Sequence, residues 1–277
     1  MNNKSLRIAI LGGGNIGSSL ARGLVKGKMC SPEQIIITRR KMVLLDELAG
    51  EGFTVTSDNE EAVKKCDLIV LAVLPQQINQ LLDDIHHHID PKHHLLISVV
   101  SGVSTQDILQ HLRKDVPLVR AMPNTAIAIR ESMTCIASGN ASRENIQLVH
   151  SLFDTVGKTV EISEDLITSA TALCACGIAF FLRAIRAASQ GGIEIGFHAD
   201  EALMMASQTA KGAAALLLAT GNHPEREIDK VTSPKGCTIA GLNEMEHHGF
   251  SSALIKGIRI SAEKAGGLYV RNSLSLH

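Results

Sequence analysis

The 277-residue chain is poor in aromatic side chains and has almost no net charge. It contains no tryptophan and one tyrosine, and its formal net charge at pH 7 is −1. Proteins that bind nucleic acids need a basic surface, and those that bind single strands also need aromatic rings on which bases stack. The composition therefore argues against a nucleic-acid partner and favours a small-molecule ligand.

The sequence also lacks long apolar runs, a leader-like start and paired cysteines. No apolar segment followed by a small-residue cleavage site opens the chain, and no run of about 18 apolar residues predicts a membrane span. None of the six cysteines belongs to a CxxC pair, which favours reduced thiols in a cytoplasmic protein. The histidine clusters 86–88, 93–94 and 247–248 lack zinc-ligand spacing, so we expect no metal site.

Short apolar runs alternate with segments of helical period in the first half of the chain. We predict strands at residues 6–11, 34–38, 67–73, 94–100, 117–122, 133–137 and 158–162. We predict helices at residues 16–26, 41–49, 60–65, 76–85, 105–112 and 142–155. Strands that are apolar throughout are typical of a sheet covered on both faces. The pattern predicts an α/β fold, namely a Rossmann-type doubly wound parallel sheet.

The composition of the sequence changes after Ile162. Three long segments rich in alanine, leucine and methionine follow, and we interpret them as helices. We therefore predict a dinucleotide-binding domain at residues 1–162 and an all-helical substrate and dimerisation domain at residues 163–277. Helices that are apolar around much of their circumference need neighbours on several sides, which favours a homodimer.

A glycine-rich turn, ILGGGNIG, follows the first predicted strand and opens the first predicted helix. Gly12, Gly14 and Gly17 form the G-x-G-x-x-G pattern of dinucleotide-binding turns. In that pattern the glycines allow a tight turn, a close approach to a pyrophosphate and close packing of the helix, whose N-terminus favours the anion. The turn predicts a bound dinucleotide.

The end of the second predicted strand indicates which dinucleotide is bound. An acidic residue at this point would bind the ribose hydroxyls of NAD, but here the sequence has Thr38, Arg39 and Arg40. Arginine pairs strongly with phosphate, so we predict NADP(H), held through its 2′-phosphate by Arg39 and Arg40.

The stretch VTSPKGCTIAGL, residues 231–242, resembles the C-terminal signature of the pyrroline-5-carboxylate reductases. The segments GGGNIG, DNEEAV, SVVSGVS, RAMPNTAIAI and QTAKGAA match that family in the same order. The resemblance implies reduction of a cyclic imine to proline with NAD(P)H. It also implies a Rossmann domain followed by a helical domain that dimerises by interleaving, with dimers that often form larger rings.

The matching motifs imply a set of cofactor-binding residues, in which Asn124 lies near the nicotinamide. The others are Leu11, Gly12, Gly13, Gly14, Asn15, Ile16, Thr38, Asn59, Ala72, Val73, Leu74, Pro75, Val99, Val100 and Ser101.

The resemblance also gives the stretch at residues 231–242 a chemical role. The backbone N–H groups of Gly236, Cys237 and Thr238, at a predicted helix start, would hold the substrate carboxylate. The Thr238 hydroxyl would hydrogen-bond the ring nitrogen, which makes Thr238 the candidate catalytic residue. The substrate loop would contribute Cys174, Cys176 and Gly177.

The chain departs from the family pattern where the substrate is expected. The family loop S-G-S-G-P-A-Y is here CACGIAF, residues 174–180, and thiols are weaker hydrogen-bond donors than hydroxyls. Two alternatives therefore stay open: an NADP-dependent paralogue acting on another cyclic imine, and a catalytically weak NADP-binding regulatory protein. Lys211 lies in an apolar helix and is either a catalytic lysine or, as we prefer, a surface lysine whose stem covers apolar atoms.

Overall fold

The computed structural model describes residues 6–269, which divide by their contacts into two compact units. The first unit contains the residues up to Cys176 and those from Ile260 onward. The second unit is Gly177–Arg259.

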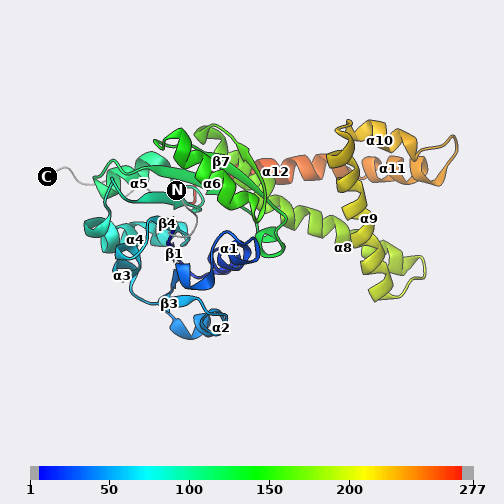
Figure 1. The fold of residues 1–277 in the computed structure, drawn as a ribbon. Helices are drawn as coiled ribbons and strands as arrows, with labels where there is room; N and C mark the ends of the chain where they lie inside the picture. Colours follow the sequence, from blue (N-terminus) through cyan, green and yellow to red (C-terminus); the bar gives the residue numbers. More distant parts are fainter. Residues whose placement is uncertain (1–5, 270–277) are drawn as a thin grey trace. The chain divides into compact units, whose positions relative to one another are not determined.

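The first unit is built on one eight-stranded sheet with the order β3-β2-β1-β4-β5-β6-β7-β8 (Figure 1). The strands are β1 Ile8–Leu11, β2 Ile35–Thr38, β3 Thr54–Thr56, β4 Leu68–Leu71, β5 Leu95–Ser98, β6 Leu118–Met122, β7 Ser132–Ala137 and β8 Gly157–Glu161. All neighbouring pairs are parallel except β6 with β7. The predicted Rossmann-type sheet is confirmed, with one antiparallel step near its end.

Helices cover both faces of this sheet because its strands are apolar on both sides. Ile8 and Ile10 of β1 pack in a core cluster with α1 and α6, whereas Ala9 and Leu11 of the same strand pack with α3, α4 and α5. The helices of the first unit are α1 Asn15–Lys26, α2 Asp46–Gly50, α3 Asn59–Lys64, α4 Ile78–Ile85, α5 Thr105–Leu112, α6 Arg143–Asp154 and α7 Ile167–Ala170. The alternation of side chains along each strand thus produces the two layers of helices.

The second unit is helical. It contains α8 Gly177–Glu194, α9 Ala199–Thr220, α10 Pro224–Lys230, α11 Cys237–His247 and the first residues of α12 Phe250–Gly266. Helices α8 and α9 are neighbours within it. The predicted helical C-terminal region is therefore confirmed for the described residues.

Three features were not foreseen from the sequence. Strand β3 has only three residues, and none of them is buried. The sequence therefore has no apolar run that predicts this strand. Helix α10 lies between the helical segments that we singled out, and α12 follows the last of them. The third feature is a π-helical turn, Thr171–Cys176, which interrupts the expected continuous helix between α7 and α8. Single π-helical turns are frequent at functional sites.

Candidate functional site

The glycine turn between β1 and α1 can be formed only with glycine at two positions. Gly12 has a φ of +121°, and a Cβ atom there would lie 2.3 Å from the backbone oxygen of Ala72. A Cβ atom at Gly17 would lie 2.2 Å from the backbone oxygen of Gly12. The two glycines therefore let the turn lie tightly against the end of β4 and against its own helix.

Gly14 differs, because a Cβ atom there would meet nothing within 4 Å. Gly14 is the N-cap of α1, and no side chain caps this helix end. The first backbone N–H groups of a helix have no partner within the helix. The turn thus presents unshielded N–H groups at an open position, the arrangement that a pyrophosphate requires.

The end of β2 is bonded to this turn. The backbone N–H groups of Gly12 and Gly13 donate to the oxygen of Thr38, at 3.2 and 2.7 Å. The Thr38 hydroxyl donates to Oδ1 of Asn59 at 2.6 Å. Arg39 reaches back, and its Nη1 donates to the oxygen of Gly13 at 2.8 Å.

Arg39 therefore places a guanidinium beside the glycine turn, and the side chain of Arg40 next to it is exposed. This arrangement fits a phosphate on the ribose that a dinucleotide would carry to the end of β2. Four of the predicted cofactor residues from distant segments, Gly13, Thr38, Arg39 and Asn59, are brought together here by hydrogen bonds.

Two further groups of predicted cofactor residues, 72–75 and 99–101, follow β4 and β5 at the same edge of the sheet. The N–H of Ala72 donates to the oxygen of Leu11 at 2.9 Å, and the N–H of Val99 donates to the oxygen of Leu71 at 3.0 Å. The strand order reverses direction next to β1, which is where dinucleotides bind in such sheets. Leu74 is 64% exposed at this edge.

Asn124 follows β6 and is 5% exposed. Its Oδ1 accepts from the N–H of Ala126 at 3.0 Å, and its Nδ2 donates to the backbone oxygen of Cys174 at 3.2 Å. The predicted nicotinamide residue thus holds the backbone of the predicted substrate loop. The Sγ of Cys174 in turn lies 3.7 Å from the Sγ of Cys135 on β7.

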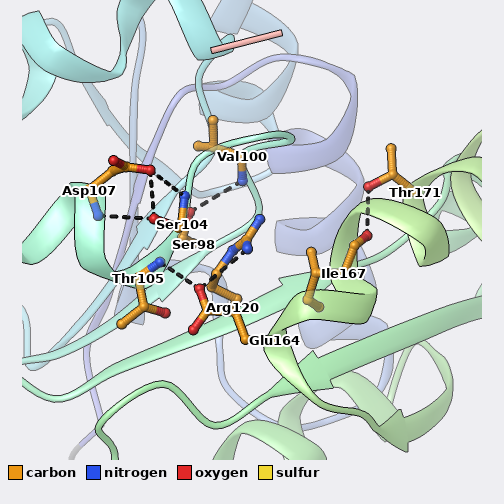
Figure 2. Close-up of polar contacts among 9 residues, drawn as sticks. All are labelled: Ser98, Val100, Ser104, Thr105, Asp107, Arg120, Glu164, Ile167 and Thr171. Carbon is orange, nitrogen blue, oxygen red and sulfur yellow. Dashed lines mark hydrogen bonds and ion pairs between the residues drawn. The ribbon is translucent and has the colours of Figure 1, made fainter. Parts of the chain in front are cut away.

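A buried ion pair beside this loop was missed by the sequence analysis. Arg120 lies in the middle of β6 and is 4% exposed. Its Nη1 lies 3.4 Å from Oε1 of Glu164. Figure 2 shows the two side chains pointing toward each other. The same carboxylate oxygen accepts from the N–H of Thr105 at 2.6 Å. Burial lowers the pKa of Arg120, and the charge and hydrogen bond of Glu164 oppose that effect. An arginine inside the apolar strand PLVRAM was the signal available in the sequence.

A cavity of about 340 Å³ lies next to this ion pair. Its lining residues are Gly102, Ser104, Gln106, Arg120, Glu164, Asp165 and Thr168. None of these is among the predicted cofactor or substrate residues, so the cavity is distinct from the predicted dinucleotide crevice. Among the described residues, Nη2 of Arg120 and Oγ1 of Thr105 are the buried side-chain polar atoms without a hydrogen-bond partner.

The predicted carboxylate-binding segment lies in the second unit, where α11 begins at Cys237 with Gly236 as its N-cap. No side chain caps this helix end. A Cβ atom at Gly236 would lie 2.5 Å from Oγ of Ser233, so this turn also needs glycine. The Gly236 N–H donates to the oxygen of Ser233 at 2.9 Å, which leaves the amides of Cys237 and Thr238 as the stronger candidates for an anion.

Many large apolar side chains of the second unit are exposed, among them Phe181, Leu182, Ile195, Met204, Leu216 and Leu218. By length and composition alone, two helical stretches could cross a membrane, namely Glu164–Glu194 and Ala199–Thr220. In the most apolar 18 residues of each stretch, 28% and 6% respectively are buried. Most of each apolar stretch is therefore not buried within a single copy of the chain. Core helices pass the same test of length and composition, so the absence of a membrane span stays a prediction.

The other side chains singled out from the sequence have ordinary surroundings. Lys211 is exposed on α9. His88 and His111 contact carboxylates, at 2.8 Å from Glu60 and 2.7 Å from Asp83. Across residues 6–269, no group of three or more histidine, cysteine or acidic side chains is placed to hold a metal ion.

Comparison with known families gives two matches. The family model described as pyrroline-5-carboxylate reductase dimerisation matches residues 164–268. The model described as NADP oxidoreductase coenzyme F420-dependent matches residues 7–102. The two matches cover the helical and the glycine-turn parts of the chain respectively.

Curated relatives agree with these matches. Pyrroline-5-carboxylate reductases 1 and 2 of Dictyostelium discoideum are each 51% identical to this chain over 95% of its length. The chain spans 50% of the length of the first of these relatives and 93% of the second. The reductase of Methanosarcina acetivorans is 33% identical over 94% of the chain and 96% of its own length.

Solved structures share the fold. A pyrroline-5-carboxylate reductase from Coxiella burnetii has a TM-score of 0.87 at 28% identity, covering 97% of this chain and all of the other. A Plasmodium falciparum pyrroline carboxylate reductase with NADP bound has the same TM-score at 24% identity, covering 96% of this chain and 99% of the other.

Proposed function

The chain belongs to the pyrroline-5-carboxylate reductase family, and on that premise we propose that it reduces the C=N bond of 1-pyrroline-5-carboxylate to give proline, with NADPH as the hydride donor. The observation that carries the proposal is the 51% identity to a named reductase that matches this chain over 95% of its length and 93% of its own. The activity places the chain in proline biosynthesis.

The proposed cofactor is NADP(H), lying over the glycine turn. Support comes from the open position at Gly14, from the uncapped start of α1 and from the guanidinium of Arg39 beside Gly13. The match to an NADP oxidoreductase family model at residues 7–102 agrees. In this proposal α1 holds the pyrophosphate, Arg39 and Arg40 hold the 2′-phosphate, and Asn124 lies near the nicotinamide.

The proposed substrate site uses the start of α11. The amides of Cys237 and Thr238 would hold the carboxylate, and the Thr238 hydroxyl would hydrogen-bond the ring nitrogen. Gly236 shapes the turn, and Cys174, Cys176 and Gly177 belong to the substrate loop. The cofactor supplies the hydride, so the chain's own contribution is to position the imine carbon against the nicotinamide and to stabilise the ring nitrogen.

One observation favours a second candidate, an NADP-dependent reductase of a different cyclic imine. Cys174 and Cys176 stand where the family loop has serines, and Ile178 stands where it has proline. A site that has lost hydroxyl donors and gained apolar bulk would bind a ring with fewer polar substituents more readily. Turnover numbers on five-membered and six-membered cyclic imine acids distinguish the two candidates.

The exposed apolar faces of the helical unit lead us to propose a homodimer. Side chains such as Leu218, which is 89% exposed, would be covered by a second copy, and the family model that matches residues 164–268 is named for dimerisation. We also propose that the helical domain begins after residue 162 and that the dimers assemble into a larger ring. Light scattering behind size exclusion measures the assembly, and a monomer would contradict it.

We also propose a cytoplasmic location. All six cysteines are free in the structure, as expected where thiols stay reduced. The two apolar helical stretches are then accounted for by the dimer rather than by a membrane. Fractionation of cells that express the chain tests this, and recovery in the membrane pellet would contradict it.

The reaction is tested by following the loss of NADPH absorbance with 1-pyrroline-5-carboxylate. Thr238→Ala should lower kcat at least about tenfold, in line with the loss of a hydrogen bond to a charged group, and Thr238→Ser should restore most of it. Thr232→Ala is the matched control, because its hydroxyl bonds only the end of α10, through Ile228. An unchanged kcat in Thr238→Ala would overturn the catalytic role of Thr238.

A further inference from the structure

Two cysteines that are far apart in the sequence meet in the first unit. Cys135 lies on β7 and Cys174 lies in the π-helical turn Thr171–Cys176, and their Sγ atoms are 3.7 Å apart. Cys135 is 4% exposed, whereas Cys174 is partly exposed. The Cys174 thiol is therefore accessible to a small reagent, whereas the Cys135 thiol is buried next to it.

The surroundings of the pair make the two thiols unequal. The contact between the two sulfur atoms lowers the pKa of Cys174 below the usual value for a thiol. The same contact and burial raise the pKa of Cys135. Since the thiolate is the nucleophile, Cys174 is the thiol that reacts first and Cys135 is the one that follows.

Two other cysteines of the first unit, Cys30 and Cys66, do not share this environment. Burial raises the pKa of Cys30 to about 11 and that of Cys66 to about 12. Both thiols therefore stay protonated near neutral pH and react slowly. They provide control positions within the same unit.

We propose that Cys174 is a site of oxidation by hydroperoxides and that the product is a Cys135–Cys174 disulfide. The Cys174 thiolate attacks the terminal oxygen of the hydroperoxide, the O–O bond breaks, a sulfenic acid forms and an alcohol or water leaves. The Cys135 sulfur then attacks the Cys174 sulfur, the S–O bond breaks and water leaves. Two thiols lose two electrons and two protons, and the hydroperoxide is reduced.

The geometry is close to what this product needs. A disulfide has its sulfur atoms about 2.05 Å apart, so the two Sγ atoms must approach each other by less than about 2 Å. Cys174 lies in a π-helical turn rather than in a regular helix, and the partner strand β7 is fixed between β6 and β8. We therefore expect the π-helical turn, rather than β7, to move when the disulfide forms.

The consequence for activity rests on the proposed function. Cys174 opens the CACGIAF segment, which takes the place of the family's substrate loop, and its backbone oxygen accepts from Asn124. A bond to Cys135 would draw this loop toward β7 and change the site. The serines of the family pattern cannot form such a bond, so the switch would be particular to chains with cysteine at both positions.

Peptide mass spectrometry without reduction tests the proposal on the full chain. After treatment with a few equivalents of hydrogen peroxide, a peptide pair joined through Cys135 and Cys174 and lighter by two hydrogens is expected, and dithiothreitol should remove it. Cys135→Ser should give no joined pair and should accumulate a Cys174 sulfenic acid that dimedone traps. Cys66→Ser should behave as the wild type does.

Activity provides the second readout. Peroxide should lower the wild-type rate of NADPH oxidation several-fold, reversibly with dithiothreitol, and the Cys135→Ser variant should keep its basal rate and escape the reversible loss. If Cys135→Ser does not fold, Cys174→Ser serves for the mass measurement. A bond between Cys174 and Cys176, or intact thiols at both positions, would overturn the proposal. A reduced protein without imine reductase activity would overturn the proposed function and leave the disulfide measurable.

Discussion

Nδ2 of Asn124 donates a hydrogen bond to the backbone oxygen of Cys174, 3.2 Å away and 50 positions along the chain. This bond joins the residue expected beside the nicotinamide to the loop expected beside the substrate. The buried Asn124 side chain is held at its other end by the N–H of Ala126. One buried side chain therefore links the residue proposed to lie near the nicotinamide to the loop proposed to contact the substrate.

Asn124→Ala should reduce kcat/KM for the imine about fivefold or more, because a net hydrogen bond of about 1 kcal/mol no longer fixes the loop. Asn79→Ala is the matched control, since Asn79 accepts a hydrogen bond from Tyr269 and is not among the predicted cofactor or substrate residues. Both variants should lose similar thermal stability, and only the first should lose activity. Equal activities in steady-state assays would show that the bond is structural only.

Gly12→Ala and Gly14→Ala should separate folding from cofactor binding. At Gly12 the added methyl group meets the backbone of Ala72 and φ is positive, so we expect a loss of several kcal/mol in the free energy of unfolding. At Gly14 the methyl group meets no protein atom, so the unfolding midpoint should stay within a few degrees of the wild type.

The Gly14 methyl group would instead occupy the space of a pyrophosphate, and the Kd for NADPH should rise about tenfold or more. Fluorescence titration with NADPH and thermal unfolding without cofactor measure the two effects. A Gly14→Ala variant that binds NADPH as tightly as the wild type would place the cofactor elsewhere.

Arg40→Ala should weaken NADPH binding about tenfold and leave NADH binding within about twofold, because a charge-assisted bond to phosphate contributes about 1.5–3 kcal/mol and NADH lacks that phosphate. Arg40 is the cleaner variant, since Arg39 also holds the turn through Gly13. Arg143→Ala, which removes an exposed arginine paired with Glu161, is the control. Equal losses for the two dinucleotides would refute the phosphate assignment.

Glu164→Ala should lower the free energy of unfolding by about 3–5 kcal/mol, because it leaves the buried guanidinium of Arg120 without its counter-charge and the Thr105 N–H without its acceptor. Glu164→Gln keeps an acceptor for Thr105 and should lose less. Denaturant unfolding measures both, and Glu161→Ala, at an exposed pair, should change stability by less than about 1 kcal/mol.

The sequence by itself determined seven of the eight strands and the glycine turn, because these follow from local patterns. Apolar strands such as IIIT specify burial on two faces, and Gly12 and Gly17 specify a turn that only glycine can make. The helix at residues 105–112 follows its N-cap Ser104 and was predicted with the bounds that the structure shows. The family followed from the order of several short motifs.

Only the tertiary structure decided how the loop at Cys174 is held. Its contacts with Asn124 and Cys135 join residues 50 and 39 positions apart, and the Arg120–Glu164 pair joins residues 44 positions apart. No periodicity of 2.0 or 3.6 residues carries such information. These contacts arise where the end of β6, strand β7 and the π-helical turn come together, which depends on the packing of the whole sheet.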